Sequence, residues 1–335
     1  METIREKLRN SRSIAVVRTD KLGDMVLTLP MVNALKEFCP NSHIDFIASS
    51  YTEVLLRGQN LINNYHFIDK TQGGINQIFS SNTYDAVFFP RPRFDEIFSA
   101  FRHRIPLRVG SAYRIYSFLL NHKVYQHRKI AEQNEAQYNV DLINSITGLS
   151  HQAKLLKPII PNGISIDNIY ASHSSDRIKI IIHPGGGGSA PKWSASNYGN
   201  LAKLLIDNNF CDIIITGTQD ELALADIVQT ISGNRAINLC GKLSLEQMML
   251  LISQSECLVA NSTGVLHIAA ALGVKVMGFY PNTPSMSSKR WGALTDKSEF
   301  LSPPPSNNPE ESDDLNRISV DMAYSSLKRL LNRSI

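Results

Sequence analysis

Short apolar runs typical of strands alternate with longer helix-like segments along most of the chain. Strands are predicted at 13–18, 43–48, 84–89, 107–110, 177–183, 212–216, 236–239, 256–260 and 275–280. Helices are predicted at 23–38, 131–147, 194–206, 219–231, 244–254, 262–272 and 318–331. Continuous apolar strands separated by helices indicate parallel sheets that are covered on both faces. We therefore predict an α/β protein with doubly wound parallel sheets.

The segment 155–163 contains prolines and interrupts this alternation, so it is the best candidate for a linker. With 335 residues, the chain is longer than most single cores. We predict an N-terminal Rossmann-like domain over 1–157 and a C-terminal one over 164–315. A helix within 316–335 is a candidate to pack back on the N-terminal domain, and 281–314 is expected to be a loop. Ligands of such folds bind beyond the carboxyl ends of the strands, and two facing domains predict a cleft.

The composition is that of a globular protein, with 43% hydrophobic and 19% charged residues. No apolar run approaches the roughly 20 residues that span a bilayer, and residues 1–13 lack the apolar core of a signal peptide. The four cysteines lie far apart and form no CxxC pair. We expect buried thiols in a reducing cytoplasm and no metal site.

Positive charge is concentrated in one stretch. The chain has a net charge of +4, yet residues 91–129 contain nine Lys or Arg against only Asp95 and Glu96, a local charge of +7. Tyrosines interleave with these cations. An acidic partner is expected, either nucleic acid or a phosphorylated or carboxylated lipid at a membrane surface. A solvated basic face explains any single arginine equally well.

The segment Asn261–Gly273 follows an apolar run and opens an Ala-rich helix. Its start, with Ser262, Thr263 and Gly264, offers free backbone N–H groups at the positive end of a helix dipole, which suits a phosphate. An ordinary N-cap by Ser262 or Thr263 explains the same residues. His267 lies one turn further along. Both interpretations stay open on these residues alone.

A second polar join, His183–Trp193, holds four consecutive glycines after a predicted strand. Exposed N–H groups, the hydroxyl of Ser189 and the charge of Lys192 can together hold a diphosphate. The spacing is not that of a Walker A loop, because Trp193 follows the lysine. The alternative is a flexible connector.

Carboxylates follow two further strands. Asp24 is expected in the first turn of a helix after the first strand, where it can act as a general base or simply favour the helix dipole. Glu221 or Asp220, after the strand at 212–216, can accept hydrogen bonds from a ribose or a base, or can belong to a capped helix start.

Together these segments resemble glycosyltransferase family 9, the ADP-heptose:lipopolysaccharide heptosyltransferases, from Ile14 to about Leu294. No single segment is specific to this family, but the order and spacing of the segments together are specific. The resemblance rests on Lys21-Leu22-Gly23-Asp24 with Thr28-Leu29-Pro30, Arg104 to Gly110, His183-Pro184-Gly185 with Lys192-Trp193, Asn261 to Gly273, and Ser288-Lys289-Arg290-Trp291.

The resemblance implies a GT-B fold with the acceptor in the N-terminal domain and the donor in the C-terminal one. It also implies a metal-independent inverting transfer that needs no cofactor, with Asp24 as the base and Lys192 countering charge on the departing diphosphate. The donor-binding residues that we expect are Gly23, Gly186, Gly187, Ser189, Lys192, Glu221, Ser262, Thr263, Gly264 and His267.

The same resemblance gives the basic stretch a partner, an anionic glycolipid of the lipopolysaccharide core at the inner face of the inner membrane. We expect Arg91, Arg93, Arg104 and Arg108 to face the acceptor or the membrane, and we expect no nucleic acid. The alternatives are a GT-B transferase that uses another nucleotide sugar, a nucleotide-binding epimerase or dehydrogenase, and a non-catalytic nucleotide-binding, nucleic-acid-binding or scaffold protein. The missing GxGxxG fingerprint argues against an epimerase or dehydrogenase.

One position departs from the family pattern. Many members have an aspartate just before the Thr-Gly pair, where it can accept hydrogen bonds from the donor sugar. Here that residue is Ser262, which is neutral and shorter. The segment therefore supports a glycosyltransferase more firmly than it supports heptose as the sugar.

Overall fold

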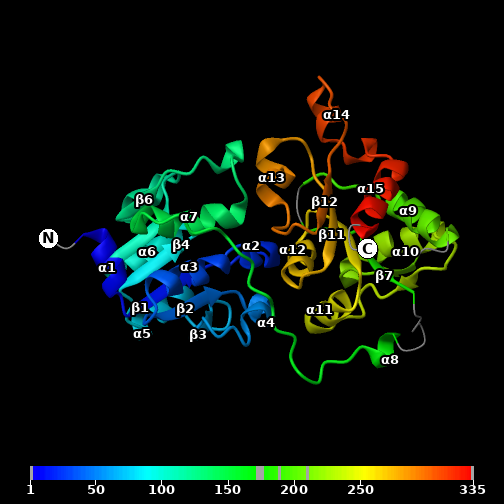
Figure 1. Ribbon diagram of the computed structural model, residues 1–335. Helices are drawn as coiled ribbons and strands as arrows, with labels where there is room; N and C mark the ends of the chain where they lie inside the picture. Colours follow the sequence, from blue (N-terminus) through cyan, green and yellow to red (C-terminus); the bar gives the residue numbers. More distant parts are fainter. Residues whose placement is uncertain (1–2, 171–176, 188–189, 209–210, 333–335) are drawn as a thin grey trace. The chain divides into compact units, whose positions relative to one another are not determined.

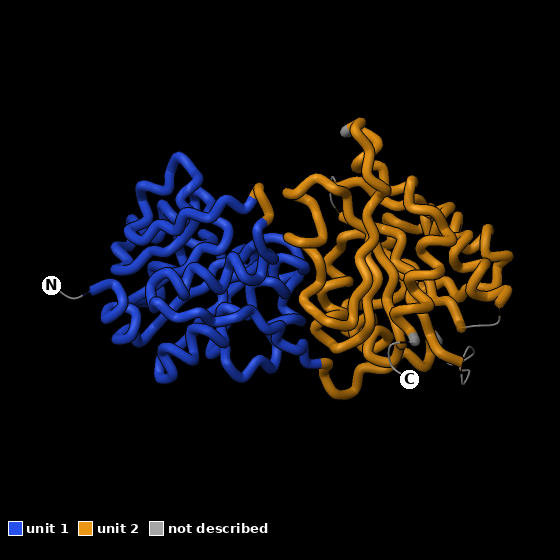
Figure 2. Tube along the Cα trace, turned by 45° about the horizontal axis from the view of Figure 1, so that its top comes forward, with its two compact units in different colours: residues 1–128, 132–159 blue, residues 129–131, 160–335 orange. Residues whose placement is uncertain are grey.

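The computed structural model describes residues 3–170, 177–187, 190–208 and 211–332. The chain divides into two compact units, which Figure 2 shows in different colours. Unit 1 consists of Met1–Arg128 and Glu132–Ile159, and unit 2 of Lys129–Ala131 and Ile160–Ile335. The main division, after Ile159, falls inside the segment that the sequence marks as a linker.

Unit 1 contains a six-stranded parallel sheet with the order β3-β2-β1-β4-β5-β6 (Figure 1). Its strands are β1 (Ser13–Val17), β2 (His43–Ala48), β3 (Asn64–Phe67), β4 (Ala86–Phe89), β5 (Leu107–Ser111) and β6 (His122–Val124). Its helices are α1 (Ile4–Asn10), α2 (Leu22–Val26), α3 (Pro30–Phe38), α4 (Glu53–Leu56), α5 (Gly74–Ser81), α6 (Phe94–Arg102) and α7 (Glu135–Thr147), with a 3₁₀ turn η2 (Ile115–Leu119).

Unit 2 contains a second six-stranded parallel sheet, with the order β12-β11-β10-β7-β8-β9. Its strands are β7 (Lys179–His183), β8 (Asp212–Ile215), β9 (Ile237–Asn238), β10 (Cys257–Asn261), β11 (Lys275–Phe279) and β12 (Ser298–Leu301). Its helices are α8 (Asp167–Tyr170), α9 (Ala195–Asp207), α10 (Leu222–Ile231), α11 (Leu245–Ser253), α12 (Gly264–Ala271), α13 (Ser288–Trp291), α14 (Pro309–Asp313) and α15 (Val320–Asn332).

Numbered from its own first strand, each sheet has the Rossmann order 3-2-1-4-5-6. The first strand pairs with the second on one side and the fourth on the other, so β1 lies between β2 and β4, and β7 between β8 and β10. The connections after the two central strands therefore leave in opposite directions. This topology predicts a ligand site at the carboxyl end of β1 and β4, and another at that of β7 and β10.

The predicted helix at 23–38 is two helices, α2 and α3. Pro30 has no N–H to donate, so it cannot continue a helix from α2, but it fits the first position of α3. The sequence also missed three strands, β3, β6 and β12, because each is only partly buried and lacks a continuous apolar run. The strand β12 lies in the segment that was expected to be a loop.

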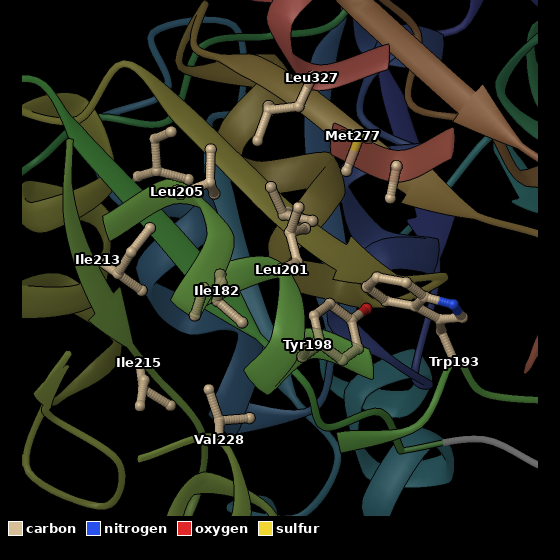
Figure 3. Close-up of a cluster of buried hydrophobic side chains, with 14 of the residues drawn as sticks. Ile182, Trp193, Tyr198, Leu201, Leu205, Ile213, Ile215, Val228, Met277 and Leu327 are labelled. Carbon is tan, nitrogen blue, oxygen red and sulfur yellow. The ribbon is translucent and has the colours of Figure 1, made fainter. Parts of the chain in front are cut away.

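The largest side chains of unit 2 meet around its central strands (Figure 3). The ring of Trp193 stacks on Phe279 with centroids 4.3 Å apart, and Tyr198 meets both rings edge-on. These contacts tie the start of α9 to the end of β11. The four cysteines are buried thiols, as expected. Within the described ranges, none of the helices is both long and apolar enough to cross a bilayer.

Helix α15 is part of unit 2. It lies against α9 and β12, and its apolar stripe, with Ala323, Leu327 and Leu330, joins the buried core around Ile180 and Met277. A stripe of this kind loses water contact wherever it packs, and here unit 2 provides the apolar partner.

We predict that Leu327→Ala destabilises the protein by about 2–4 kcal/mol, because it leaves a cavity beneath α15. The measurement is urea unfolding followed by tryptophan fluorescence, since Trp193 lies in the same core. Met322→Ala on the exposed side of the same helix is the matched control, with a change within about 0.5 kcal/mol. Equal losses in both variants would contradict the assignment of α15 to this core.

Candidate active site

The carboxyl edge of the sheet in unit 1 brings together residues from two loops. The loop after β1 contains Thr19 and Asp20, with Asp24 next in the first turn of α2, and the loop after β4 contains Arg91 and Arg93. Both segments follow strands that flank the point where the strand order reverses, which is where ligands of such sheets bind.

Arg18 is the buried centre of this edge. Its guanidinium donates to the carboxylate of Asp24 and, through Nε, to Oδ1 of Asp20 at 2.5 Å. Oδ2 of Asp20 also lies 3.2 Å from Nη1 of Arg91. Nη1 of Arg18 is buried without a hydrogen-bond partner among the described residues. A fully desolvated cation therefore has two carboxylates to balance its charge, which keeps the guanidinium charged inside the protein.

The pKa of Asp24 is raised above its ordinary value. Burial is the largest cause, Arg18 acts against it, and the nearby carboxylates of Asp20 and Glu135 raise it further. A base works best when its pKa approaches the working pH. Gly23, just before it, is buried in the first turn of α2, so the backbone there is tightly packed.

A second carboxyl group lies deeper at the same edge. Glu96, in the first turn of α6, is buried and accepts a hydrogen bond from Thr19 Oγ1 at 2.5 Å. Burial raises its pKa to about 7. Glu96 also lines a cavity of about 460 Å³ between α5 and α6, together with Phe94, Ser99 and Arg102.

The four arginines expected to face the acceptor or the membrane do not lie together. Arg91 and Arg93 follow β4, at the edge that holds Asp24, whereas Arg104 and Arg108 lie at the amino end of β5. Arg108 donates to the carbonyls of Leu119 and Ile105 at 2.9 and 2.6 Å, so its role is structural. The two pairs therefore lie at opposite ends of β4 and β5, which run parallel.

In unit 2, Asn261 joins the two loops at the reversal point. Its amide Nδ2 donates to the carbonyl of Pro184 at 3.1 Å, and Oδ1 accepts from the backbone N–H of Trp193 at 2.9 Å. This buried side chain at the end of β10 therefore holds both ends of the glycine-rich loop that follows β7. The position of Lys192 is set by its neighbour Trp193.

Glu221 organises the neighbouring strand ends. Its carboxylate accepts from the N–H groups of Gly186 and Thr218, both at 2.8 Å, and these bonds and His183 hold its pKa below its ordinary value. A β-carbon on Gly185 would lie 2.0 Å from Oε1 of Glu221, so a larger residue there would displace this carboxylate. Glu221 also belongs to a capped helix start, in which it forms a capping box with Thr218. Part of its carboxylate remains exposed.

The expected phosphate-binding residues lie close together in unit 2. A β-carbon on Gly186 would lie 3.7 Å from Cε of Lys192 and 3.8 Å from the methyl group of Thr263, so these three residues border one space. Gly187 is exposed in the same loop, while Ser189 lies outside the described residues. Thr263 caps α12 by accepting from the N–H of Val265 at 3.2 Å.

Three residues of the α12 start have distinct surroundings. Gly264 is its first residue, at the positive end of the helix. Ser262 is close enough to the hydroxyl of Tyr280 to offset part of the rise that burial causes in the pKa of that tyrosine. Burial lowers the pKa of His267 to about 4, so its imidazole is neutral and brings no positive charge to a phosphate.

Sequence reasoning missed Arg18, Glu96 and Asn261 as organising residues. The signal for Arg18 was present, because an arginine directly after an apolar strand and just before two acids needs partners. Nothing in the sequence showed that Glu96 is buried or that Asn261 spans two loops. Within the described ranges, no group of three or more His, Cys, Asp or Glu is placed to hold a metal ion.

We predict that Glu96→Gln changes how stability depends on pH. The folded protein keeps a proton on Glu96 up to about pH 7, whereas an unfolded glutamate loses it near 4.5. The free energy of unfolding of the wild type therefore falls as the pH rises from 4.5 through 7. The total loss is about 1.4 kcal/mol for each unit by which the folded pKa exceeds the unfolded one. The variant lacks this loss. Its free energy of unfolding relative to the wild type, measured with urea, should therefore be roughly 3 kcal/mol higher at about pH 8 than at about pH 4.5.

Glu132→Gln, at an exposed glutamate of the same unit, is the control for the loss of one carboxylate. Its difference from the wild type should be the same at both pH values. If Glu96→Gln behaves like this control, Glu96 is ionised in the folded protein.

Comparison with known proteins agrees with this arrangement. The model of glycosyltransferase family 9 (heptosyltransferase) matches residues 82–316. A Haemophilus influenzae protein named only provisionally as a glycosyltransferase is 26% identical, over 94% of this chain and 95% of that protein. Lipopolysaccharide heptosyltransferase 2 of Salmonella typhimurium is 24% identical, over 82% of this chain and 84% of that enzyme.

Among solved structures, a family 9 glycosyl transferase from Veillonella parvula superposes with a TM-score of 0.81 at 17% identity, over 98% of this chain and 99% of that one. This likeness extends over both Rossmann-like units and confirms the GT-B fold class that the sequence predicts. The family model covers more than half of the chain, so the protein belongs to glycosyltransferase family 9 and is a glycosyltransferase.

Proposed function

We propose that the protein transfers heptose from ADP-heptose to the saccharide core of a lipopolysaccharide, with inversion and without a divalent metal or another cofactor. The observation that carries the proposal is the buried carboxylate of Asp24 at the reversal point of the first sheet, with its raised pKa. The named relatives that are heptosyltransferases support the choice of sugar. The place of action is the cytoplasm, at the inner face of the inner membrane.

The transfer is a single displacement. An acceptor hydroxyl gives its proton to Asp24 while its oxygen bonds to the anomeric carbon of the donor. The bond from that carbon to the diphosphate breaks, and the bonding electrons remain on the nucleoside diphosphate. Asp24 has to be ionised to receive the proton, and Arg18 favours that ionised form while burial raises the basicity of the carboxylate.

The departing diphosphate gains negative charge, which the residues around Gly186 are suited to receive. Lys192 supplies a positive charge, and the start of α12 supplies the N–H group of Gly264 at the positive end of the helix. The N–H of Gly186 is already donated to Glu221, so Gly186 contributes space for the phosphate rather than a hydrogen bond. Glu221 keeps part of its carboxylate exposed for a ribose hydroxyl.

The acceptor is assigned to unit 1, where Arg91 and Arg93 share an edge with Asp24. Both arginines are exposed and partly engaged, Arg91 with Asp20 and Arg93 with Asp95 at 3.4 Å. They can exchange these partners for a phosphate or carboxylate of the saccharide core at little cost, because exposed ion pairs are weak. Arg104 and Arg108 are left out of this assignment.

A second candidate is transfer of another sugar, and Ser262 is the observation that favours it. Ser262 is neutral and shorter than the aspartate that many family members have at this position, so it offers the sugar a weaker hydrogen-bond acceptor. A donor whose hydroxyl groups differ from those of heptose would suit this position better.

We predict that ADP raises the melting temperature more than GDP or UDP does, because a bound nucleotide stabilises only the folded protein. A mass-spectrometric assay with a core saccharide acceptor should then show added heptose with ADP-heptose and not with ADP-glucose or UDP-glucose. Addition of hexose instead would replace the first candidate by the second, and no transfer from any nucleotide sugar would contradict both.

We predict that Asp24→Asn lowers the rate of transfer about a hundredfold to ten-thousandfold and leaves the dissociation constant of ADP nearly unchanged. The amide fills the same volume and cannot accept the proton, and Asp20 still pairs with Arg18. Lys192→Ala is the contrasting variant, with ADP binding weakened roughly tenfold or more. Equal losses of ADP binding and transfer in Asp24→Asn would contradict its role as the base.

A further inference from the structure

Helix α6 and the turn η2 expose large apolar side chains that the proposed chemistry does not use. Phe94, Phe98 and Phe101 lie one turn apart along α6, and Ile115 and Phe118 lie on η2. The exposed fractions are 97% for Ile115, 69% for Phe118 and 54% for Phe94. We call these five residues, with the exposed arginines at 93, 102, 104 and 114, the α6–η2 surface.

The two elements of this surface are in contact along their length. The rings of Phe94 and Phe98 stack with centroids 5.5 Å apart, and Phe94 meets Tyr116 of η2 edge-on at 5.7 Å. At the other end of α6, Phe101 lies against the guanidinium of Arg108, which donates to the carbonyl of Leu119. The exposed side chains therefore belong to one continuous surface and are not scattered.

Its charge is as distinctive as its apolarity. Residues 91–129 carry a net charge of +7 in a chain of +4, so the other residues together carry −3. The acidic residues of the stretch do little to offset the arginines, because Glu96 is buried and Asp95 lies beside Arg93. Aromatic rings flanked by arginines match an anionic bilayer, whose headgroups attract the cations and whose acyl boundary accepts the rings.

We propose that the α6–η2 surface docks the protein on an anionic lipid bilayer. An acidic protein partner fits less well, because the surface offers few hydrogen-bonding side chains between its arginines and carries its apolar groups on a short helix and turn. Exposed apolar area of this extent also marks a site of association rather than an inert surface.

This docking would bring the proposed transferase to the membrane that carries its acceptor. It rests on the proposed function in one respect, that the acceptor is linked to a lipid. Phe94 follows Arg93 directly in the chain, so one end of the surface borders the edge that holds Asp24. A saccharide carried by a lipid of that bilayer would be presented at the edge where its hydroxyl is deprotonated.

The test is flotation of the full chain with vesicles of phosphatidylcholine alone or mixed with phosphatidylglycerol. We expect binding to the anionic vesicles only, and weaker binding as salt is added. The triple variant Phe98→Ser, Ile115→Ser, Phe118→Ser and the double variant Arg102→Glu, Arg114→Glu should each bind at least roughly tenfold more weakly.

Matched controls lie in unit 2. Ile227→Ser with Met322→Ser removes partly exposed apolar groups, and Lys203→Glu reverses an exposed charge, and both should bind like the wild type. Unchanged stabilisation by ADP shows that each variant is folded and keeps this test separate from the proposed function. The proposal is overturned if the wild-type protein does not bind anionic vesicles, or if the variants bind them as well as the wild type does. It is also overturned if the only effect of the triple substitution is to convert a dimer to a monomer.

Discussion

In both sheets the chain leaves the first strand toward one neighbour and later returns to pair the fourth strand on its other side. Loops that depart in opposite directions cannot cover the carboxyl end of such a strand pair, so backbone and side chains there stay available to a ligand. Asp24 and Arg91 occupy this position in unit 1, and Gly186 and Thr263 occupy it in unit 2. The residues that bear on function follow from strand order, although the halves show no repeat in sequence.

The edge in unit 1 depends on a balance of charges. Removing the guanidinium of Arg18 from water is costly, and the carboxylates of Asp20 and Asp24 compensate for it at short range. The same burial opposes ionisation of Asp24, so the residue is neither a free surface acid nor a fully neutralised member of an ion pair. The carboxylate of Asp24 therefore both balances the charge of Arg18 and has its basicity set in part by that residue. A change in Arg18 would alter both properties.

Much of the fold could be predicted from the sequence because its central strands are continuous apolar runs. The predicted strand at 43–48 coincides with β2, and the segments at 177–183 and 275–280 contain β7 and β11. Edge strands such as β6 could not be found in this way, because half-buried strands contain polar residues. The separation of Arg91 and Arg93 from Arg104 and Arg108 could not be predicted for a different reason: residues close in sequence can lie at opposite ends of a parallel strand pair.

Trp193 connects regions that are far apart in the chain. Its indole Nε1 donates to the carbonyl of Ile318 at 2.9 Å, and the adjoining N–H of Ser194 donates to Oδ1 of Asn316 at 3.0 Å. Lys192 precedes this anchored pair, so the last segment of the polypeptide helps to place the charge that we assign to the proposed nucleotide site. Shortening the chain after α14 would therefore perturb that charge from a distance, with every residue of the glycine-rich loop still in place.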